Sequence, residues 1–161
     1  MNTKFKKANN KEIHILSRGV VIDRDYILLC KSRNLEQNFY FLPGGHIEYK
    51  ESAQVALLRE LLEEANIKGN IKRFLGVFEC VFEPARDNKV CHTHEYNLIF
   101  EVQAENITCE GQVISSETHI EFAWVKLSEL ENIDLCPEIF IKLIPKWLEM
   151  NINQEFKSNI V

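Results

Sequence analysis

Residues 42–67 read Leu-Pro-Gly-Gly-His-Ile-Glu-Tyr-Lys-Glu-Ser-Ala-Gln-Val-Ala-Leu-Leu-Arg-Glu-Leu-Leu-Glu-Glu-Ala-Asn-Ile. The Pro-Gly-Gly at 43–45 predicts a turn, because this sequence can continue neither a helix nor a central strand. No glycine or proline interrupts the chain from Ser52 to residue 65, which predicts a helix with Ser52 as its N-cap. Asn66 is the expected stop, since asparagine tolerates the left-handed conformation that ends many helices.

The predicted helix has an apolar face and an acidic face. Its apolar stripe at helical spacing is Leu57, Leu58, Leu61, Leu62 and Ala65. Glu60, Glu63 and Glu64 share another side, although like charges at this spacing cost roughly 0.2–0.5 kcal/mol per pair. Three carboxylates beside a glycine turn suit a hard cation such as Mg²⁺ or Mn²⁺. An acidic run is also common on a solvated face, so charge alone leaves both interpretations open.

The order of these residues resembles the Nudix box, G-x5-E-x7-R-E-U-x-E-E-x-G-U, in which U is aliphatic. The matching residues are Gly45, Glu51, Arg59, Glu60, Leu61, Glu63, Glu64 and Ile67. Asn66 stands at the second glycine of the family, a change we expect to be mild because asparagine also accepts positive φ. Lys50 stands where many relatives have glycine, so the loop is expected to differ slightly.

Apolar and alternating runs outside this stretch predict mainly strands. The expected strands are 13–22, 26–31, 45–48, 71–82, 91–102 and 120–127. Ser128 begins a predicted helical turn, and Pro137 opens a last helix that Pro145 kinks or divides. Composition alone supports only mixed α and β structure. The resemblance implies an α/β/α sandwich around a mixed β-sheet, as a single domain over residues 12–150, with flexible termini at 1–11 and 151–161.

The resemblance also implies a metal site. In it, Glu60, Glu63 and Glu64, with the carbonyl of Gly45, hold Mg²⁺, for which Mn²⁺ can substitute. Glu51 and Arg59 form an ion pair that braces the loop against the helix.

Family members often add a carboxylate from outside the box, as a metal ligand or as the base that activates water. Glu95 is the first candidate here, and Glu117 and Glu121 follow, although each is also an ordinary surface glutamate. The sequence does not decide between Glu95 and the glutamates of the box as the base.

The function implied is metal-dependent hydrolysis of a nucleoside diphosphate linked to another group, with water attacking a phosphorus of the diphosphate. The small size favours a nucleoside triphosphate pyrophosphohydrolase, resembling MutT. ADP-ribose, nucleotide sugars, dinucleoside polyphosphates and the mRNA cap remain alternative substrates. A catalytically silent nucleotide-binding module on the same fold is the alternative outside enzymes.

Other residues carry weaker signals. Lys31 and Arg33 at a strand end either meet substrate phosphates or are solvated, and Phe39-Tyr40-Phe41 supplies either a base-stacking ring or core packing. His46, next to the glycine turn, needs no role.

Cys91, His92 and His94, with Cys80 upstream, have residue types that bind zinc, which would make this a small zinc-binding structural protein. Their spacing matches no usual zinc pattern, so hydrogen-bonded or exposed histidines are expected instead.

Composition bounds the remaining possibilities. The chain has 161 residues and a net charge of −5, and no basic stripe marks a nucleic-acid polymer as its partner. Five scattered cysteines, an odd number, indicate reduced thiols and a cytoplasmic location. No apolar run approaches the roughly 18 residues that span a bilayer. A small-molecule nucleotide derivative is the expected partner, and a homodimer is the expected assembly.

Overall fold

The computed structural model describes residues 12–33, 39–83, 92–149 and 154–160. The strands are β1 (Ile13–Asp23), β2 (Tyr26–Ser32), β3 (Tyr40–Phe41), β4 (Gly44–His46), β5 (Gly69–Val81), β6 (His94–Ala104), β7 (Ile120–Lys126) and β8 (Glu155–Ser158). The helices are α1 (Ala53–Ala65), the 3-10 helix η1 (Leu127–Asn132) and α2 (Phe140–Leu148).

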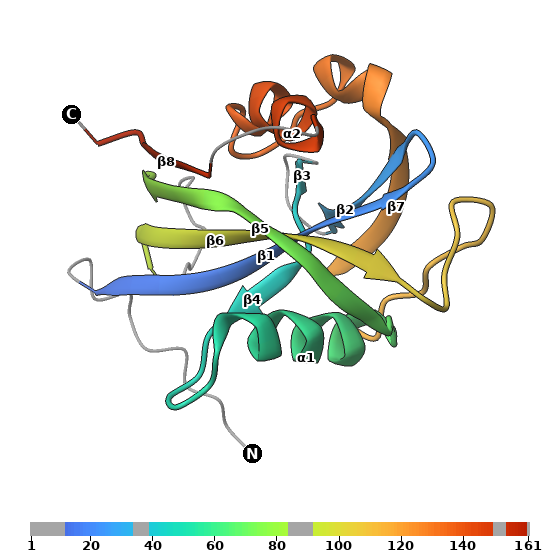
Figure 1. The fold of residues 1–161 in the computed structure, drawn as a ribbon, viewed down its shortest axis with the longest axis horizontal. Helices are drawn as coiled ribbons and strands as arrows, with labels where there is room; N and C mark the ends of the chain where they lie inside the picture. The colour runs from blue at the N-terminus through green and yellow to red at the C-terminus, as the bar shows by residue number, and fades with distance from the viewer. Residues whose placement is uncertain (1–11, 34–38, 84–91, 150–153, 161) are drawn as a thin grey trace.

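The strands form one mixed sheet in the order β3-β2-β1-β6-β5-β8, with β4 added on β1 and β7 on β2. β1 runs parallel to β6 and β5 parallel to β8, whereas the other pairings are antiparallel. Figure 1 shows α1 on one face of this sheet and η1 with α2 on the other. The predicted α/β/α sandwich around a mixed sheet is therefore confirmed.

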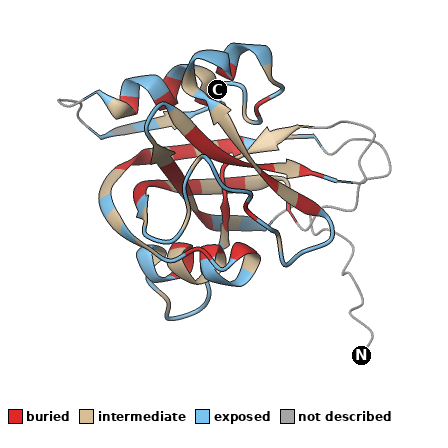
Figure 2. Ribbon diagram, turned by 90° about the vertical axis from the view of Figure 1, so that its right-hand side faces the viewer, coloured by how far each residue is buried: buried red, intermediate tan, exposed pale blue. Residues whose placement is uncertain are grey.

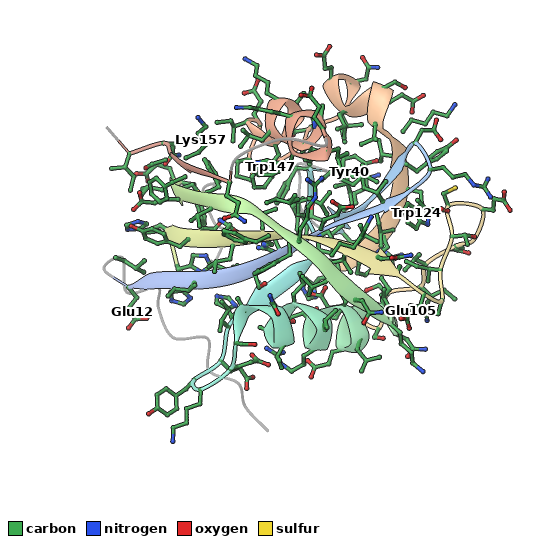
Figure 3. The ribbon with its side chains drawn as sticks, in the orientation of Figure 1. Glu12, Tyr40, Glu105, Trp124, Trp147 and Lys157 are labelled. Carbon is green, nitrogen blue, oxygen red and sulfur yellow. The ribbon has the colours of Figure 1, made fainter. Side chains whose placement is uncertain are left out.

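The central strands are buried on both faces, because adjacent residues point to opposite sides. In β1, Val20 belongs to the core under α2 and Val21 to the core under α1. Figure 2 shows this burial along the middle of the sheet. Trp147 of α2, labelled in Figure 3, is 1% exposed and anchors its helix to the sheet. Two cores thus fix the sheet between the helical layers.

The ends of α1 follow the local sequence. The Ser52 side chain accepts a hydrogen bond from the Val55 amide at 3.3 Å, which confirms the predicted N-cap. Asn66 has φ 52° and ψ 33°, and the amides of Asn66 and Ile67 donate to the carbonyls of Leu62 and Leu61. The glycine of the family pattern is therefore replaced here by an asparagine in the left-handed conformation.

The C-terminal helix differs from its prediction. It begins at Phe140 rather than at Pro137, because the residues between them form turns, in which the Phe140 amide donates to the Pro137 carbonyl. Pro145 lies inside α2 and does not divide it. A proline there removes a single helical hydrogen bond, and the buried Phe140, Ile144 and Trp147 hold the helix on the sheet.

The C-terminal tail is also more ordered than expected. Residues 155–158 form β8 on the edge of the sheet, from the Gly76–Glu155 pair to the Glu79–Ser158 pair. The Asn159 side chain holds both the amide and the carbonyl of Val81, at 2.8 and 2.9 Å. These contacts are made by the backbone and one polar side chain, so no apolar pattern in the sequence predicts them. The termini at 1–11, 150–153 and 161 lie outside the described residues.

Two further observations concern the whole described chain. None of the described helices combines the length and the apolar character needed to cross a bilayer. Cys30, Cys80, Cys109 and Cys136 are free thiols, and Cys91 lies outside the described residues.

Candidate metal-dependent active site

The glycine turn is held against β1. Gly44 has φ +119°, and a Cβ there would collide with the Ser17 carbonyl oxygen, so the position requires glycine. The Arg18 guanidinium donates to the carbonyls of Gly44 at 2.7 Å and Leu42 at 3.2 Å. Arg18 was not among the predicted site residues. Its only signal was a charged residue within the apolar strand.

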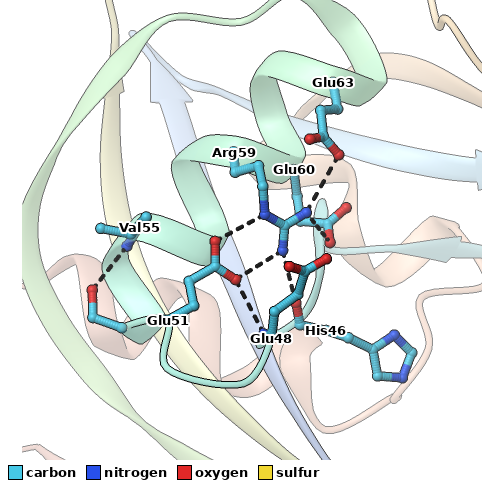
Figure 4. A network of polar contacts seen from close by, with 8 residues as sticks. His46, Glu48, Glu51, Val55, Arg59, Glu60 and Glu63 are labelled. Carbon is cyan, nitrogen blue, oxygen red and sulfur yellow. Dashed lines mark hydrogen bonds and ion pairs between the residues drawn. The ribbon is translucent and has the colours of Figure 1, made fainter.

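Arg59 connects the loop to the helix. Its guanidinium makes a bidentate ion pair with Glu51, at 2.8 and 2.9 Å, as expected. It also reaches Glu60 at 3.0 Å, Glu63 at 3.3 Å and the His46 carbonyl at 3.1 Å. Figure 4 shows this fan of contacts around one guanidinium. Arg59 therefore fixes the loop and two of the predicted metal ligands relative to each other.

Hydrogen bonds to Glu51 keep its carboxylate ionised. The Arg59 side chain and the Glu48 backbone lower the pKa of Glu51 to about 2. The hydrogen bond with Glu51, and after it the one with Glu60, raises the pKa of Arg59 above its ordinary value, against the opposing effect of burial. Lys50, at the position that is often glycine, has φ 67°. A lysine thus adopts the left-handed conformation in this loop, and the loop still closes on Arg59.

The backbone of Gly45 lies directly against the Glu60 carboxylate. A Cβ on Gly45 would fall 2.5 Å from the Glu60 Cδ and within 2.8 Å of both carboxylate oxygens. The loop and the acidic face of α1 are therefore in contact, as the resemblance implied. The role of the Gly45 carbonyl as a metal ligand stays a prediction.

Glu64 is a carboxylate whose charge is poorly compensated. Burial and the neighbouring charge of Glu60 raise its pKa to about 7, against smaller opposing effects of Arg18 and the Gly44 amide. Its Oε2 atom is buried and has no hydrogen-bond partner among the described residues. Glu63, by contrast, has 62% of its side chain exposed. Crowded carboxylates with an unpartnered buried oxygen suit a hard divalent cation. Such an ion would offset the repulsion between the carboxylates and coordinate the unpartnered oxygen.

The candidate carboxylates outside the helix lie in different places. The Glu117 charge contributes to the raised pKa of Glu64, so Glu117 lies within electrostatic reach of the acidic face. Glu121 is paired with Lys31 at 3.6 Å and Arg33 at 3.2 Å. Those two cations, considered above for phosphate binding, therefore share one carboxylate within the protein.

Glu95 sits in a different environment, fully supplied with donors. Its Oε1 accepts from Asn97 at 2.8 Å and Cys80 at 3.3 Å, and its Oε2 contacts His92 Nε2 at 2.7 Å. Burial opposes ionisation, but these bonds and the charge of Arg18 together lower the pKa of Glu95 to about 2. A carboxylate held in this way is a weak base.

The group of Cys80, His92 and His94 that was considered for zinc is not brought together, and both histidines are hydrogen-bonded to glutamates, as expected. Cys80 bonds Glu95, and His94 contacts Glu79 at 3.2 Å. His92 instead gathers with His14 and His46. Cys91 lies outside the described residues.

The aromatic run before the glycine turn mainly packs. Tyr40 contacts the core under α2, and Phe41 the core under α1.

The structure is thus an α/β sandwich in which a glycine loop packs against the acidic face of a helix. The NUDIX domain model matches residues 14–145, and the chain belongs to that family. It is 26% identical over 130 residues to an ADP-ribose pyrophosphatase of Methanocaldococcus jannaschii, covering 80% of this chain and 71% of that protein. It is 42% identical over 55 residues to mouse diphosphoinositol polyphosphate phosphohydrolase 3-alpha, covering 34% of this chain and 33% of that protein.

The fold is shared with solved structures. A MutT protein from Methanosarcina mazei Go1 superposes with a TM-score of 0.64 at 21% identity, covering 87% of this chain and 96% of that one. This likeness concerns the architecture. The matched segment spans only about a third of the diphosphoinositol polyphosphate phosphohydrolase.

Proposed function

We propose that this protein is a Mg²⁺-dependent hydrolase that cleaves a phosphoanhydride or phosphoester bond of a nucleoside diphosphate derivative. The observation that carries the proposal is the crowding of Glu60 and Glu64 beside Gly45, with one Glu64 oxygen buried and unpartnered. A site of this kind is costly without a cation and suited to one. Mn²⁺ should substitute, since it takes the same oxygen ligands.

The acids of α1 and the residues of the loop have different roles in this proposal. Glu60, Glu63 and Glu64 would hold the ion, which neutralises the diphosphate and lowers the pKa of the attacking water. Arg59, through Glu51 and the His46 carbonyl, keeps the loop and the acids in one arrangement. Such positioning lowers the activation free energy of hydrolysis, because the reacting groups need little reorganisation.

We assign the proton acceptor to a carboxylate near Glu64 rather than to Glu95. Glu117 is within electrostatic reach of Glu64 and has 42% of its side chain exposed, so water can approach it; one of its oxygens contacts His119 at 3.0 Å. Glu95 has both oxygens engaged and a low pKa. General base catalysis favours a carboxylate that still has a site for the incoming proton.

The charge of the site supports a nucleotide rather than a more highly phosphorylated substrate. Glu48, Glu51, Glu60, Glu63 and Glu64 crowd the loop and helix, while Arg59 is already shared among several of them. A diphosphate can be met there by metal ions, but an inositol polyphosphate would bring more negative charge than they offset. Nucleoside triphosphates are the substrates to test first. ADP-ribose is the second candidate, because a relative that covers 80% of this chain is named for it.

Release of phosphate-containing products from a panel of compounds tests this proposal. The panel holds nucleoside triphosphates, ADP-ribose, nucleotide sugars, dinucleoside polyphosphates, a cap analogue and a diphosphoinositol polyphosphate. We expect at least one nucleotide to be hydrolysed with Mg²⁺ and not with a chelator, and oxygen-18 water to label the attacked phosphorus. Binding of nucleotides without any hydrolysis would instead identify a silent binding module.

A further inference from the structure

Three histidines from distant parts of the chain meet on one face of the sheet. His14 lies in β1, His46 ends β4, and His92 comes just before β6. The strand register brings them together: His46 pairs with Leu16, and His14 pairs with Glu95. Positions set by backbone pairing of strands are more rigid than positions on loops.

The geometry of the three rings is close to that of metal ligands. One ring nitrogen from each histidine lies within 4.8 Å of the others, and His14 Nδ1 is 2.9 Å from His46 Nε2. Ligands at 2.0–2.1 Å from a tetrahedral zinc are separated by about 3.3 Å. To bind one ion, the rings would have to turn so that all three nitrogens reach that spacing and face one point. The His14 and His92 rings are stacked, with centroids 4.3 Å apart and planes at 18°, so they must tilt relative to each other before their nitrogens converge.

One carboxylate is hydrogen-bonded to a ring of the cluster, and a second lies farther away. Glu95 Oε2 lies 2.7 Å from His92 Nε2, so a metal would take Nδ1 of that ring. Glu12, labelled at the start of β1 in Figure 3, lies 3.7 Å from His14 Nε2, and His14 Nδ1 faces His46. Histidines that bind metals commonly give their second nitrogen to a carboxylate, which orients the ring and raises its basicity. The two carboxylates also offset the charge of a divalent ion.

We propose that His14, His46 and His92 form a binding site for a divalent transition metal, with Zn²⁺ as the expected ion. Three imidazoles select borderline metals such as zinc, whereas the carboxylates of α1 select magnesium. His46 is exposed, so a water molecule completes a four-coordinate site from the solvent side. The site is separate from the acidic face of α1 and does not depend on the proposed hydrolysis.

His46 connects the two sites. Its carbonyl accepts from Arg59, whereas Figure 4 shows its imidazole directed away from that guanidinium. An ion on the imidazole would therefore fix the end of β4, next to the glycine turn. The Zn²⁺ site is in a position to hold the loop from its other side.

A Co²⁺ titration, followed by visible absorption, tests the proposal on full-length protein without a histidine tag. Excess Mg²⁺ occupies the carboxylate site during the titration. We expect one equivalent of Co²⁺ in a four-coordinate site, displaced by Zn²⁺. His14→Gln and His92→Gln should each abolish this signal, and Glu95→Gln should weaken binding about 10–100-fold.

His94→Gln is the matched control, because His94 contacts Glu79 and does not belong to the cluster. It should bind Co²⁺ as the unmodified protein does, and so should Glu60→Gln. Circular dichroism shows whether each variant is folded, and His14, which is only partly buried, provides the test if His92→Gln does not fold. Absence of Co²⁺ binding, or binding unchanged in His14→Gln, overturns the proposal.

Discussion

Two buried carboxylates in different regions of this molecule have pKa values shifted in opposite directions. Glu64, on the acidic face of α1, has an unpartnered oxygen, and burial with the charge of Glu60 raises its pKa to about 7. Glu95, on the β6 strand beside the histidines, has donors on both oxygens and a pKa of about 2 despite its burial. In the first region Arg59 is shared among several carboxylates and the negative charge stays in excess. In the second region the Glu95 carboxylate already has its hydrogen-bond donors.

The difference teaches where chemistry is to be expected. A buried group that the protein leaves uncompensated costs stability, and such costs are characteristic of functional sites. A fully bonded group more often orients its neighbours. We therefore place Glu64 among the groups that contact the reacting centre, and Glu95 among those that position a histidine.

Exchange of each carboxylate for an amide gives the largest expected effect. Glu64→Gln, Glu60→Gln and Glu63→Gln should each lower kcat by about 10²-fold or more, because they remove charge that faces the transition state. Glu95→Gln should lower the melting temperature and change kcat much less. Steady-state hydrolysis with Mg²⁺ measures the first effect and thermal unfolding the second.

Glu129→Gln on the exposed surface of η1 is the control for both measurements. Near-normal turnover of Glu63→Gln would count against the metal site on α1. A loss of kcat in Glu95→Gln as large as in Glu64→Gln would erase the distinction between the two regions and restore Glu95 as a candidate base.

The glycine turn gives the next largest effect. In Gly45→Ala the new Cβ would lie 2.5 Å from the Glu60 Cδ, so the carboxylate must move by about 1 Å. A displacement of that size in a catalytic group can cost about 10²-fold in rate. Gly111→Ala is the matched control, since its Cβ meets only the Thr108 carbonyl oxygen at 3.6 Å. Equal turnover of the two variants would show that Glu60 need not touch the loop.

Glu64 should also contribute to stability with the opposite pH dependence to Glu95, and Glu51 of the first region should behave as Glu95 does. Folding raises the pKa of Glu64 from 4.5 to about 7, so its contribution to stability is full below pH 4.5 and is lost as the pH rises through 7. This amounts to roughly 3 kcal/mol at most. Glu51 and Glu95, with pKa values of about 2, contribute stability above pH 4.5 that is lost as the pH falls towards 2.

Denaturant unfolding in a chelator between pH 5 and 8 measures the Glu64 contribution. Glu64→Gln should flatten the decline in stability with rising pH, and Mg²⁺ should restore stability at pH 8 in the unmodified protein. A decline that persists unchanged in Glu64→Gln would assign it to other groups. The Glu129→Gln control should keep the slope of the unmodified protein.

The sequence predicted the first region far better than the second. The caps at Ser52 and Asn66 and the Glu51–Arg59 pair depend on residues close in sequence, and each lies where it was expected. The histidine cluster depends on the register of β1 with β4 and β6, which no local pattern encodes. β8 was also missed, because an edge strand held by its backbone needs no apolar alternation and so leaves no local pattern.

The smallest effect concerns the one departure from the family pattern on α1. Asn66 has positive φ, and its carbonyl accepts from the Asn106 side chain at 2.8 Å, a backbone contact that glycine preserves. Asn66→Gly should therefore leave kcat unchanged and shift the melting temperature very little. Asn66→Ala places a Cβ in the left-handed region and should cost about 1 kcal/mol, or about 2–4 °C. Equal melting temperatures for the two variants would mean that the helix can end without the left-handed conformation at residue 66. The position of the acidic face would then depend on Arg59 and not on the C-cap.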